Sequence, residues 1–371
     1  MEIVYTPKGY RGFKSLLLRQ RKPLLRQAKV AFTFLGVDKY MQLSYLTLTT
    51  TDPAFNLAAE QYVFDHLPKD RTYLMLWQNE NAVIIGKHQN TYAEINAEYV
   101  SKHQIKVVRR LSGGGAVYHD LGNLNFTFIT DADQKNAIDF HKFCTPIIKA
   151  LHKMGIPAQI NGRNDMLIDG KKFSGNSQYV RGGRVMHHGT LLFDSDLNMI
   201  SNVLQVDPAK IEAKGIKSVR SRVTNISEYL DAKITMQEFK ETILAYILND
   251  TSGSEYILKD EDIDSIEKIR LERYDSWAWN YGSSPPCTLA KKERIEGCGS
   301  VEVRLNIENG YIQSAHIYGD FFSSKDPNQL CQLLVGIRPT RNDYKKALQD
   351  IETGPYIFGL NKDRFIELLC K

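Results

Sequence analysis

The chain has 371 residues, of which 42% are hydrophobic and 25% are charged. This composition is ordinary for a globular protein, and the length predicts a large domain with a smaller one. No apolar run approaches the roughly 20 residues that span a bilayer, so we expect no membrane partner. The five cysteines stand far apart without a C-x-x-C pair, which argues against a disulfide framework and against a zinc site.

The net charge of +5 comes from the first 40 residues. Nine Lys or Arg stand there against two acids, a net of +7, whereas the other 331 residues carry 39 basic and 41 acidic groups, a net of −2. A nearly neutral body argues against a nucleic-acid partner, which would need many phosphate contacts. We interpret residues 1–40 as a basic extension, disordered or not native, and expect a cytoplasmic protein; a transit peptide to an organelle is the alternative.

The elements that follow alternate between strand and helix patterns. Strands are expected over 42–49, 73–77, 82–86, 105–109, 123–130, 166–168, 172–173, 185–193 and 301–307. Helices are expected after Asp52-Pro53, over 143–154, after Asp207-Pro208, after the Thr235-x-x-Glu238 capping box, and near residues 326, 340 and 361. Mixed elements without a regular βαβ repeat predict an α+β fold. We place a catalytic domain over 41–283 and, after the Ser283–Pro286 linker, a small α/β domain over 284–371.

A run of three glycines marks the first chemical segment, Arg109 to Asp120. Consecutive glycines weaken a strand, so the backbone there does something that a Cβ would prevent. Close approach of a phosphate to N–H groups, with an arginine fork beside it, is one such need. A glycine-rich hairpin or bulge is the structural alternative.

The second segment places Lys172, followed by Ser-Gly, after Asn164 and Asp165. A lysine in a turn is usually a solvated surface residue. Asn164 and Asp165 supply the oxygen ligands that Mg²⁺ prefers, and capping of the turn is their alternative role.

Two further segments carry polar or aromatic candidates. His187 and His188 are neighbours in a predicted strand, so their side chains point to opposite faces, and no third ligand at suitable spacing supports zinc. We expect His188 and Thr190 to line a pocket. Trp77, at the end of its strand, suits a ligand wall and the core equally well.

Together these segments resemble the bacterial lipoate–protein ligases of the biotin/lipoate ligase superfamily. The motifs are RRxSGGGAVYHDxGNxxFT (109–127), GRND (162–165), KxSGxx (172–177), HHGTLL (187–192), KGIxSVRSRVTNI (214–226) and SWAWNYG (276–282). The resemblance runs from about residue 41 to the end. It implies a large catalytic domain of mixed sheets and helices, and a small C-terminal domain that moves during the reaction.

The resemblance implies ATP-dependent activation of lipoate to lipoyl-AMP, with release of pyrophosphate, and transfer to a lysine. The implied acceptors are lipoyl domains of 2-oxoacid dehydrogenase E2 subunits and the glycine cleavage H protein; Mg²⁺ is the implied metal and a monomer is expected. The implied catalytic residue is Lys172. The implied ATP-binding residues are Arg110, Gly115, Ala116, Val117, Tyr118, Asn164, Asp165 and Lys172, with Asp165 as metal ligand. The implied lipoate-binding residues are Lys172, Trp77, Ser112, His119, His188 and Thr190.

One position departs from the resembling proteins, which can carry an arginine where this chain has Tyr179. Arg181 and Arg184 are candidates to replace that arginine, so the nucleotide role at this position stays open.

Three other functions compete with the ligase. An octanoyl- or lipoyltransferase would take its acyl group from a carrier thioester, but Cys144 is the only cysteine within the mapped motifs' span and lies on a predicted helix. Biotin ligation is disfavoured by the form of the glycine motif. A non-catalytic lipoate-binding or regulatory module is disfavoured by complete motifs around Arg110, Gly115 and Lys172.

Overall fold

The computed structural model describes residues 42–131, 139–162, 164–205, 222–250, 253–284, 286–319, 321, 323 and 325–371. The basic extension (1–40), the helix expected after Asp207-Pro208 and residues 214–221 of the KGI motif lie outside these ranges. Within the described ranges, no helix is both long enough and apolar enough to cross a membrane.

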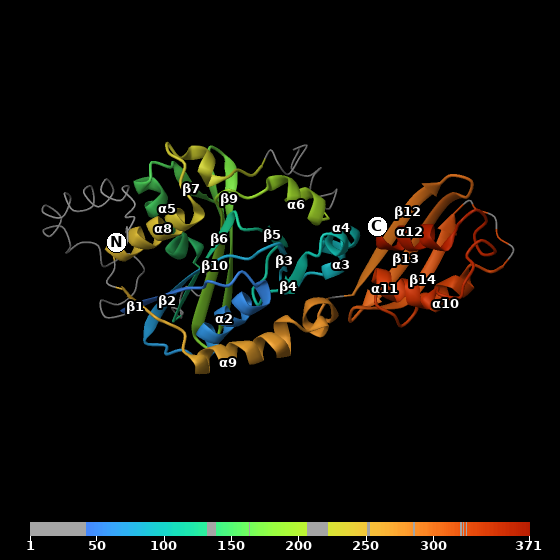
Figure 1. Cartoon of the computed structure of the whole chain (residues 1–371), viewed down its shortest axis with the longest axis horizontal. Helices are drawn as coiled ribbons and strands as arrows, with labels where there is room; N and C mark the ends of the chain where they lie inside the picture. Colours follow the sequence, from blue (N-terminus) through green and yellow to red (C-terminus); the bar gives the residue numbers. More distant parts are fainter. Residues whose placement is uncertain are drawn as a thin grey trace, which may run out of the picture.

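An eight-stranded mixed sheet forms the centre of the larger unit, in the order β11-β1-β2-β6-β10-β9-β8-β7 (Figure 1). Its strands are β1 (Gln42–Thr47), β2 (Arg71–Trp77), β6 (Asn123–Asp131), β7 (Ala158–Asn161), β8 (Asp165–Ile168), β9 (Lys171–Arg181), β10 (Arg184–Leu192) and β11 (Gly253–Glu255). β1 is parallel to β2 and β11, and the other neighbours are antiparallel. The α+β prediction is confirmed.

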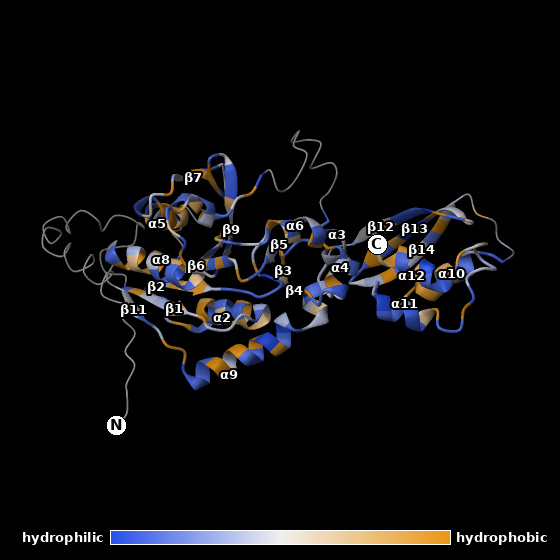
Figure 2. Cartoon of the chain, turned by 45° about the horizontal axis from the view of Figure 1, so that its top comes forward, coloured by the Kyte–Doolittle hydropathy of each residue, from blue (hydrophilic) through white to orange (hydrophobic). Residues whose placement is uncertain are grey.

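Helices cover both faces of this sheet. On one face, α5 (Phe140–Lys153) and α8 (Met236–Asp250) bury a stripe that includes Ile147, Leu151, Phe239 and Ile243. On the other, α2 (Pro53–His66) packs with α9 (Asp260–Ile269). Hydrophobic and hydrophilic segments alternate along α9 in Figure 2, as expected for a helix with one buried face.

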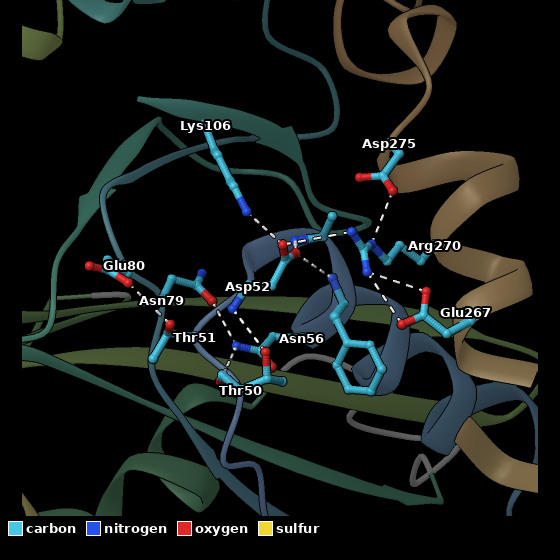
Figure 3. A network of polar contacts seen from close by, with 12 residues as sticks. Thr50, Thr51, Asp52, Asn56, Asn79, Glu80, Lys106, Glu267, Arg270 and Asp275 are labelled. Atoms are coloured by element: carbon cyan, nitrogen blue, oxygen red, sulfur yellow. Dashed lines mark hydrogen bonds and ion pairs between the residues drawn. The ribbon is translucent and has the colours of Figure 1, made fainter. Parts of the chain in front are cut away.

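The start of α2 is fixed by its predicted cap. Asp52 Oδ1 accepts hydrogen bonds from the backbone N–H groups of Ala54 (2.8 Å) and Phe55 (3.0 Å). The same carboxylate pairs with Lys106 (2.6 Å) and lies 3.8 Å from Arg270, so one side chain ties the helix to two distant segments (Figure 3). The predicted capping box before α8 is also present, because Thr235 and Glu238 bond reciprocally.

A second sheet of three strands lies beside the large one. Its order is β4-β3-β5, made by β3 (Ala82–Ile85), β4 (Lys106–Arg109) and β5 (Val117–His119). Its apolar cluster includes Ile95, which directly follows α3 (Thr91–Glu94), and residues of α4 (Ala97–Lys102) and α6 (Leu197–Val203). The strands predicted over 73–77 and 82–86 are therefore not partners: the turn at Asn79–Asn81 passes the chain from one sheet to the other.

The C-terminal part has its own sheet and core, drawn orange to red in Figure 1. The antiparallel strands β12 (Cys287–Ile295), β13 (Gly299–Glu308) and β14 (Tyr311–Gly319) pack with α10 (Asn328–Leu334), α11 (Arg341–Ala347) and α12 (Lys362–Cys370). The predicted alternation in β13 is confirmed, because Val301, Val303, Leu305 and Ile307 are all fully buried. The domain limits at 40/41 and 283/284 stay predictions.

Three short helical segments complete the described elements: η3 (Ile226–Tyr229) between α6 and α8, and η4 (Arg270–Tyr274) and η5 (Ala278–Gly282) after α9. The η4 and η5 turns carry the chain from α9 to the C-terminal sheet.

Candidate functional site

A cavity of about 160 Å³ gathers most of the predicted site residues at one place. It lies where the large sheet meets the small one, and residues of β2, β5, β6, β9 and β10 line it. Ten predicted residues line it: Trp77, Arg110, Gly115, Ala116, Val117, His119, Asn164, Lys172, His188 and Thr190. Residues up to 113 positions apart in the sequence, Trp77 and Thr190, therefore line the same cavity.

Four of the residues that line the cavity stand in one row across the large sheet. Trp77 pairs with Asn125, and Asn125 pairs with Thr190. The row continues because the Gly175 N–H donates to Thr190 Oγ1 (3.1 Å), and Gly175 pairs with Asp165. Neighbouring strands are spaced by about 4.8 Å, so Trp77 and Gly175 are about 14 Å apart. The cavity thus has a β2 end and a β9 end with different side chains.

The β9 end holds the charged groups. Lys172 Nζ lies 2.8 Å from Asp165 Oδ1, and both side chains are 39% exposed. The backbone of Lys172 is held from both sides, because its N–H donates to Arg222 O and its carbonyl accepts from the Thr224 N–H. A Cβ at Gly175 would lie 3.1 Å from Lys172 Nζ. The strand is therefore held by hydrogen bonds at Lys172, whereas the side chain of Lys172, paired with Asp165, is partly exposed to solvent.

The glycine loop is shaped from inside by Arg110. Its guanidinium is buried and donates to the carbonyls of Gly113 (2.7 Å), Gly115 (2.8 Å) and Ile84 (3.1 Å). Burial lowers the pKa of Arg110 to about 10, and the charge of Glu60 acts in the opposite direction. Gly114 has a φ of +94°, and a Cβ there would lie 3.0 Å from the guanidinium. The loop needs glycine because the arginine lies under it.

A chain of hydrogen bonds joins this loop to the β2 end. Arg110 Nε donates to Ser112 Oγ (3.1 Å), and Ser112 Oγ lies 2.6 Å from His188 Nε2. His188 Nδ1 lies 2.9 Å from Glu60 Oε1, which also accepts from the Thr127 hydroxyl (2.7 Å). Thr127 in turn accepts from the Trp77 indole N–H (3.0 Å). Every side chain that holds His188 in place is therefore itself bonded.

The β2 end is closed and its polar groups are buried. Trp77 is 2% exposed and meets the edge of the His119 ring, which is 3% exposed. Burial lowers the pKa of His119 to about 3, with smaller contributions from the charges of Arg110 and His188. His119 is therefore a neutral imidazole at physiological pH.

Three predicted residues lie near the cavity without lining it. Ser112 acts through Arg110 and His188, and Asp165 through its ion pair with Lys172. The Tyr118 side chain points to the other face of β5 and donates to Asn81 Oδ1 (3.2 Å), so only its backbone can serve a ligand. The predicted opposition of His187 and His188 is confirmed, because His187 stacks on Phe143 in the core.

The two arginines of the RR pair have different surroundings. Arg110 shapes the loop, but the Arg109 side chain faces away from the cavity. It donates to neutral acceptors on two segments: the carbonyls of Gly86, Lys87 and Gln89 with the Thr91 hydroxyl, and the carbonyls of Trp279 and Asn280 with the Ser284 hydroxyl. Arg109 thus fastens the start of the C-terminal unit to the small sheet.

The Tyr179 position has two cations beside it, but neither predicted arginine lines the cavity. Arg184 is fully buried and donates to backbone carbonyls around Phe64. Arg181 pairs with Asp65 of α2. Two cations lie over the Tyr179 ring: Lys87, with Nζ 5.5 Å from the ring centroid, and Arg181, with Cζ 5.8 Å from it.

Glu60 was missed by the sequence reasoning, although it completes the chain that holds His188. It is 2% exposed on α2. The only signal was a carboxylate within the apolar stretch FNLAAEQYVF, at helical spacing from buried neighbours. Asn125 and Asn176 also line the cavity. Asn125 gave no signal beyond its place in a predicted strand, and Asn176 none beyond its place in the KxSGxx motif.

Comparisons with known proteins agree with this geometry. The family described as lipoyl protein ligase A/B catalytic domain matches residues 52–248, and the family described as bacterial lipoate protein ligase C-terminus matches residues 284–369. The chain is 45% identical to the lipoate-protein ligase LplJ of Bacillus subtilis, over 86% of this chain and 97% of that protein. It is 43% identical to lipoate–protein ligase 1 of Staphylococcus aureus, again over 86% and 97%.

A solved structure shares the fold of the larger unit. The bipartite lipoate protein ligase of Thermoplasma acidophilum, solved in work on its E2 lipoyl domain, is 28% identical with a TM-score of 0.60. The match covers 66% of this chain and 97% of that one. Because the family matches span most of the chain and the relatives are matched along nearly their whole length, this protein belongs to the lipoate–protein ligase family.

Proposed function

We propose that the protein joins lipoate to ATP to form lipoyl-AMP, and then transfers the lipoyl group to a lysine of a lipoyl-carrier domain. The observation that carries this proposal is a single cavity with a half-exposed lysine at one end and a closed aromatic end about 14 Å away. The lysine end suits reacting anions, and the closed end suits an acyl chain.

In the first step, a carboxylate oxygen of lipoate attacks the α-phosphorus of ATP. A P–O bond forms, the bond to the β-phosphate bridge breaks, and pyrophosphate leaves. Lys172, released from Asp165, lies between the carboxylate and the phosphate and offsets their repulsion as a mobile point charge. Gly114, Gly115 and Ala116 line the same cavity and bring the loop backbone to the phosphate.

In the second step, the neutral amine of the acceptor lysine attacks the acyl carbon. A C–N bond forms, the anhydride C–O bond breaks, AMP leaves, and the amine proton is lost to solvent. Lys172 again stabilises the charge that grows on the phosphate as AMP departs. No covalent enzyme intermediate is required.

Mg²⁺ fits the β9 end of the cavity. Mg²⁺ is commonly held by one or two carboxylates together with substrate phosphates. Asp165 offers one half-exposed carboxylate beside Asn164, and the described residues contain no cluster of three metal-binding side chains that would compete. Bound there, the metal would neutralise phosphate charge during adenylate formation.

The acceptors we propose are lipoyl domains of 2-oxoacid dehydrogenase E2 subunits and the glycine cleavage H protein. The Thermoplasma work pairs a related ligase with its E2 lipoyl domain, which supports the first class. We further propose that the enzyme acts as a monomer in the cytoplasm. Light scattering of the purified chain, alone and with an apo lipoyl domain, measures the oligomeric state directly.

Thioester transfer through a cysteine is the second candidate, and the surroundings of Cys144 weigh against it. The thiol is 1% exposed, and its Sγ lies 3.9 Å from the core residue His187. Burial raises the pKa of Cys144 to about 12, and the charge of Asp139 acts in the same direction. A buried, protonated thiol outside the cavity is a poor nucleophile.

Mass spectrometry of an apo lipoyl domain, incubated with the protein, lipoate, Mg²⁺ and ATP, tests the proposal. We expect one lipoyl addition, and pyrophosphate release before any acceptor is present. A parallel reaction with acyl-carrier thioester and no ATP is the control. Acylation only in that control would overturn the ligase mechanism.

A further inference from the structure

The closed end of the cavity contains a buried polar atom without a partner. His119 lines the cavity, yet its Nε2 atom has negligible exposure and no hydrogen-bond partner among the described residues. Asn125 lines the cavity as well, and its side-chain nitrogen is also unpartnered. An unsatisfied buried donor or acceptor costs about 1–3 kcal/mol. Such a cost at a cavity wall indicates a group that a ligand satisfies.

The tautomer of His119 is fixed by two asparagines behind it, Asn79 in contact with the ring and Asn56 behind Asn79. Asn56 Nδ2 lies 3.1 Å from Thr50 O and 2.8 Å from Gln78 O, and backbone carbonyls can only accept, so the amide orientation of Asn56 is determined. The same Nδ2 lies 3.0 Å from Asn79 Oδ1. Asn79 must therefore direct its own Nδ2 to His119 Nδ1, at 3.1 Å.

Because Nδ1 accepts this bond, the single ring proton of His119 lies on Nε2. The low pKa of His119, caused first by burial, keeps the ring neutral and prevents a second proton from restoring a donor at Nδ1. The Asn56–Asn79–His119 chain thus presents one N–H group to the cavity, and that group can only donate.

This N–H donor lies where the end of the acyl chain far from its carboxylate would bind. If the carboxylate of the acyl group lies at Lys172, the row of the sheet directs the chain toward Trp77, and its far end meets His119. In lipoate the far end is a dithiolane ring with two sulfur atoms, which are weak acceptors; in octanoate it is a methyl group. Only the first can bond to the buried N–H.

We infer that the His119 Nε2–H group is a specificity-determining donor that selects acyl chains with a distal hydrogen-bond acceptor over hydrocarbon chains of similar length. A site built to donate a hydrogen bond rejects an analogue without the acceptor, because its buried polar group is left unpaired. Asn79 is a positioning residue that acts through His119. The inference rests on the proposed function for the direction in which lipoate lies.

Competition between lipoate and octanoate tests the inference, with pyrophosphate release as the readout. His119→Leu removes the donor, and we expect the ratio of kcat/KM for lipoate to that for octanoate to fall about 5-fold. His119→Gln returns an N–H donor near the same point, and its ratio should stay within about twofold of wild type. The exposed His141→Leu is the matched control. An unchanged ratio in His119→Leu would overturn the inference.

A spectroscopic measurement tests the tautomer independently of activity. ¹⁵N NMR of the histidine rings should show His119 protonated at Nε2 in the wild-type chain, and a mixture of tautomers in Asn79→Leu. A wild-type His119 protonated at Nδ1 would refute the donor. If the wild-type chain released no pyrophosphate with either acid, the proposed function would fail instead, while the NMR result would still decide whether the cavity holds a fixed donor.

Discussion

The two ends of the cavity differ in how exposed their side chains are and in how firmly hydrogen bonds hold them. At the β9 end, Lys172 and Asp165 form an ion pair, and both side chains are 39% exposed. At the β2 end, Trp77 and His119 are nearly inaccessible, and behind them every orientation is set by further bonds. The side chains at the β9 end, where the charge of the reactants changes during the reaction, can change partners. The side chains at the β2 end, where the acyl chain stays the same, are held in one orientation before the ligand binds.

Removing the charge of Lys172 tests the contrast between the two ends most directly, because it should have the largest effect. Lys172→Ala should reduce adenylate formation about 100- to 1,000-fold, because Lys172 is the only lysine among the described residues that line the cavity. Pyrophosphate release measures this, and the thermal midpoint should barely move because the side chain is half-exposed. The exposed neighbour Lys171 provides the control, Lys171→Ala. Full activity in Lys172→Ala would refute the mechanism.

Substitutions at the β2 end should instead lower the free energy of unfolding. Glu60→Ala leaves the Thr127 hydroxyl and the His188 ring without their buried partner, so unfolding should become easier by about 3 kcal/mol. Glu60→Gln keeps an acceptor for Thr127 and should cost about 1 kcal/mol. Urea denaturation measures both, with the exposed Glu272→Ala as reference. Equal stabilities of the two Glu60 variants would show that the chain of bonds does not matter.

Acid should weaken the closed end of the cavity through His119. His119 takes up a proton near pH 6.5 when unfolded but only near pH 3 when folded, so its contribution to stability is complete above about pH 6.5 and falls as the pH drops toward 3. At pH 5 the loss is about 2 kcal/mol relative to pH 7.5. His187, whose pKa burial also lowers, adds to the loss in the same direction. His119→Gln should remove its own share of the slope, and a slope equal to that of wild type would contradict the assignment.

The smallest effect is expected where the ion pair alone is changed. Asp165→Asn should alter the free energy of unfolding by less than about 0.5 kcal/mol, because exposed pairs contribute little. The same variant should raise the Mg²⁺ concentration needed for half-maximal pyrophosphate release several-fold. Titration of Mg²⁺ in both chains measures this. An unchanged Mg²⁺ requirement would remove Asp165 as metal ligand.

Much of the fold could be predicted because it is written in local patterns. The cap at Asp52 is local and appears as expected. The turns at Asp169-Gly170 and Asn309-Gly310 are local as well, because these dipeptides favour tight turns, and all four residues have positive φ. The partners of the strands could not be predicted in this way. The 82–86 strand leaves the large sheet at Asn81, and no feature of the short turn distinguishes that path from a hairpin.

The candidate site shows the same division. Strand periodicity placed His188 in the cavity and His187 in the core, because neighbours on a strand face opposite ways. The same periodicity, applied to Val117, Tyr118 and His119, would have turned the Tyr118 side chain away. Burial of Glu60 depends on contacts from β6 and β10, which are distant in sequence, so no local rule could identify it.

The hydrogen bonds of Arg109 link the strand before the glycine loop to the start of the C-terminal unit. Any swing of the C-terminal unit that starts at residues 279–284 must break bonds that this one guanidinium makes, and the Arg109 N–H is itself bonded to Asn280 Oδ1. The next residue along the chain is the arginine that supports the glycine loop. The hydrogen-exchange rate of the Arg109 amide therefore reports on these contacts. If the C-terminal unit moved away and the bonds broke, this rate would rise, and it would fall again once the bonds re-formed.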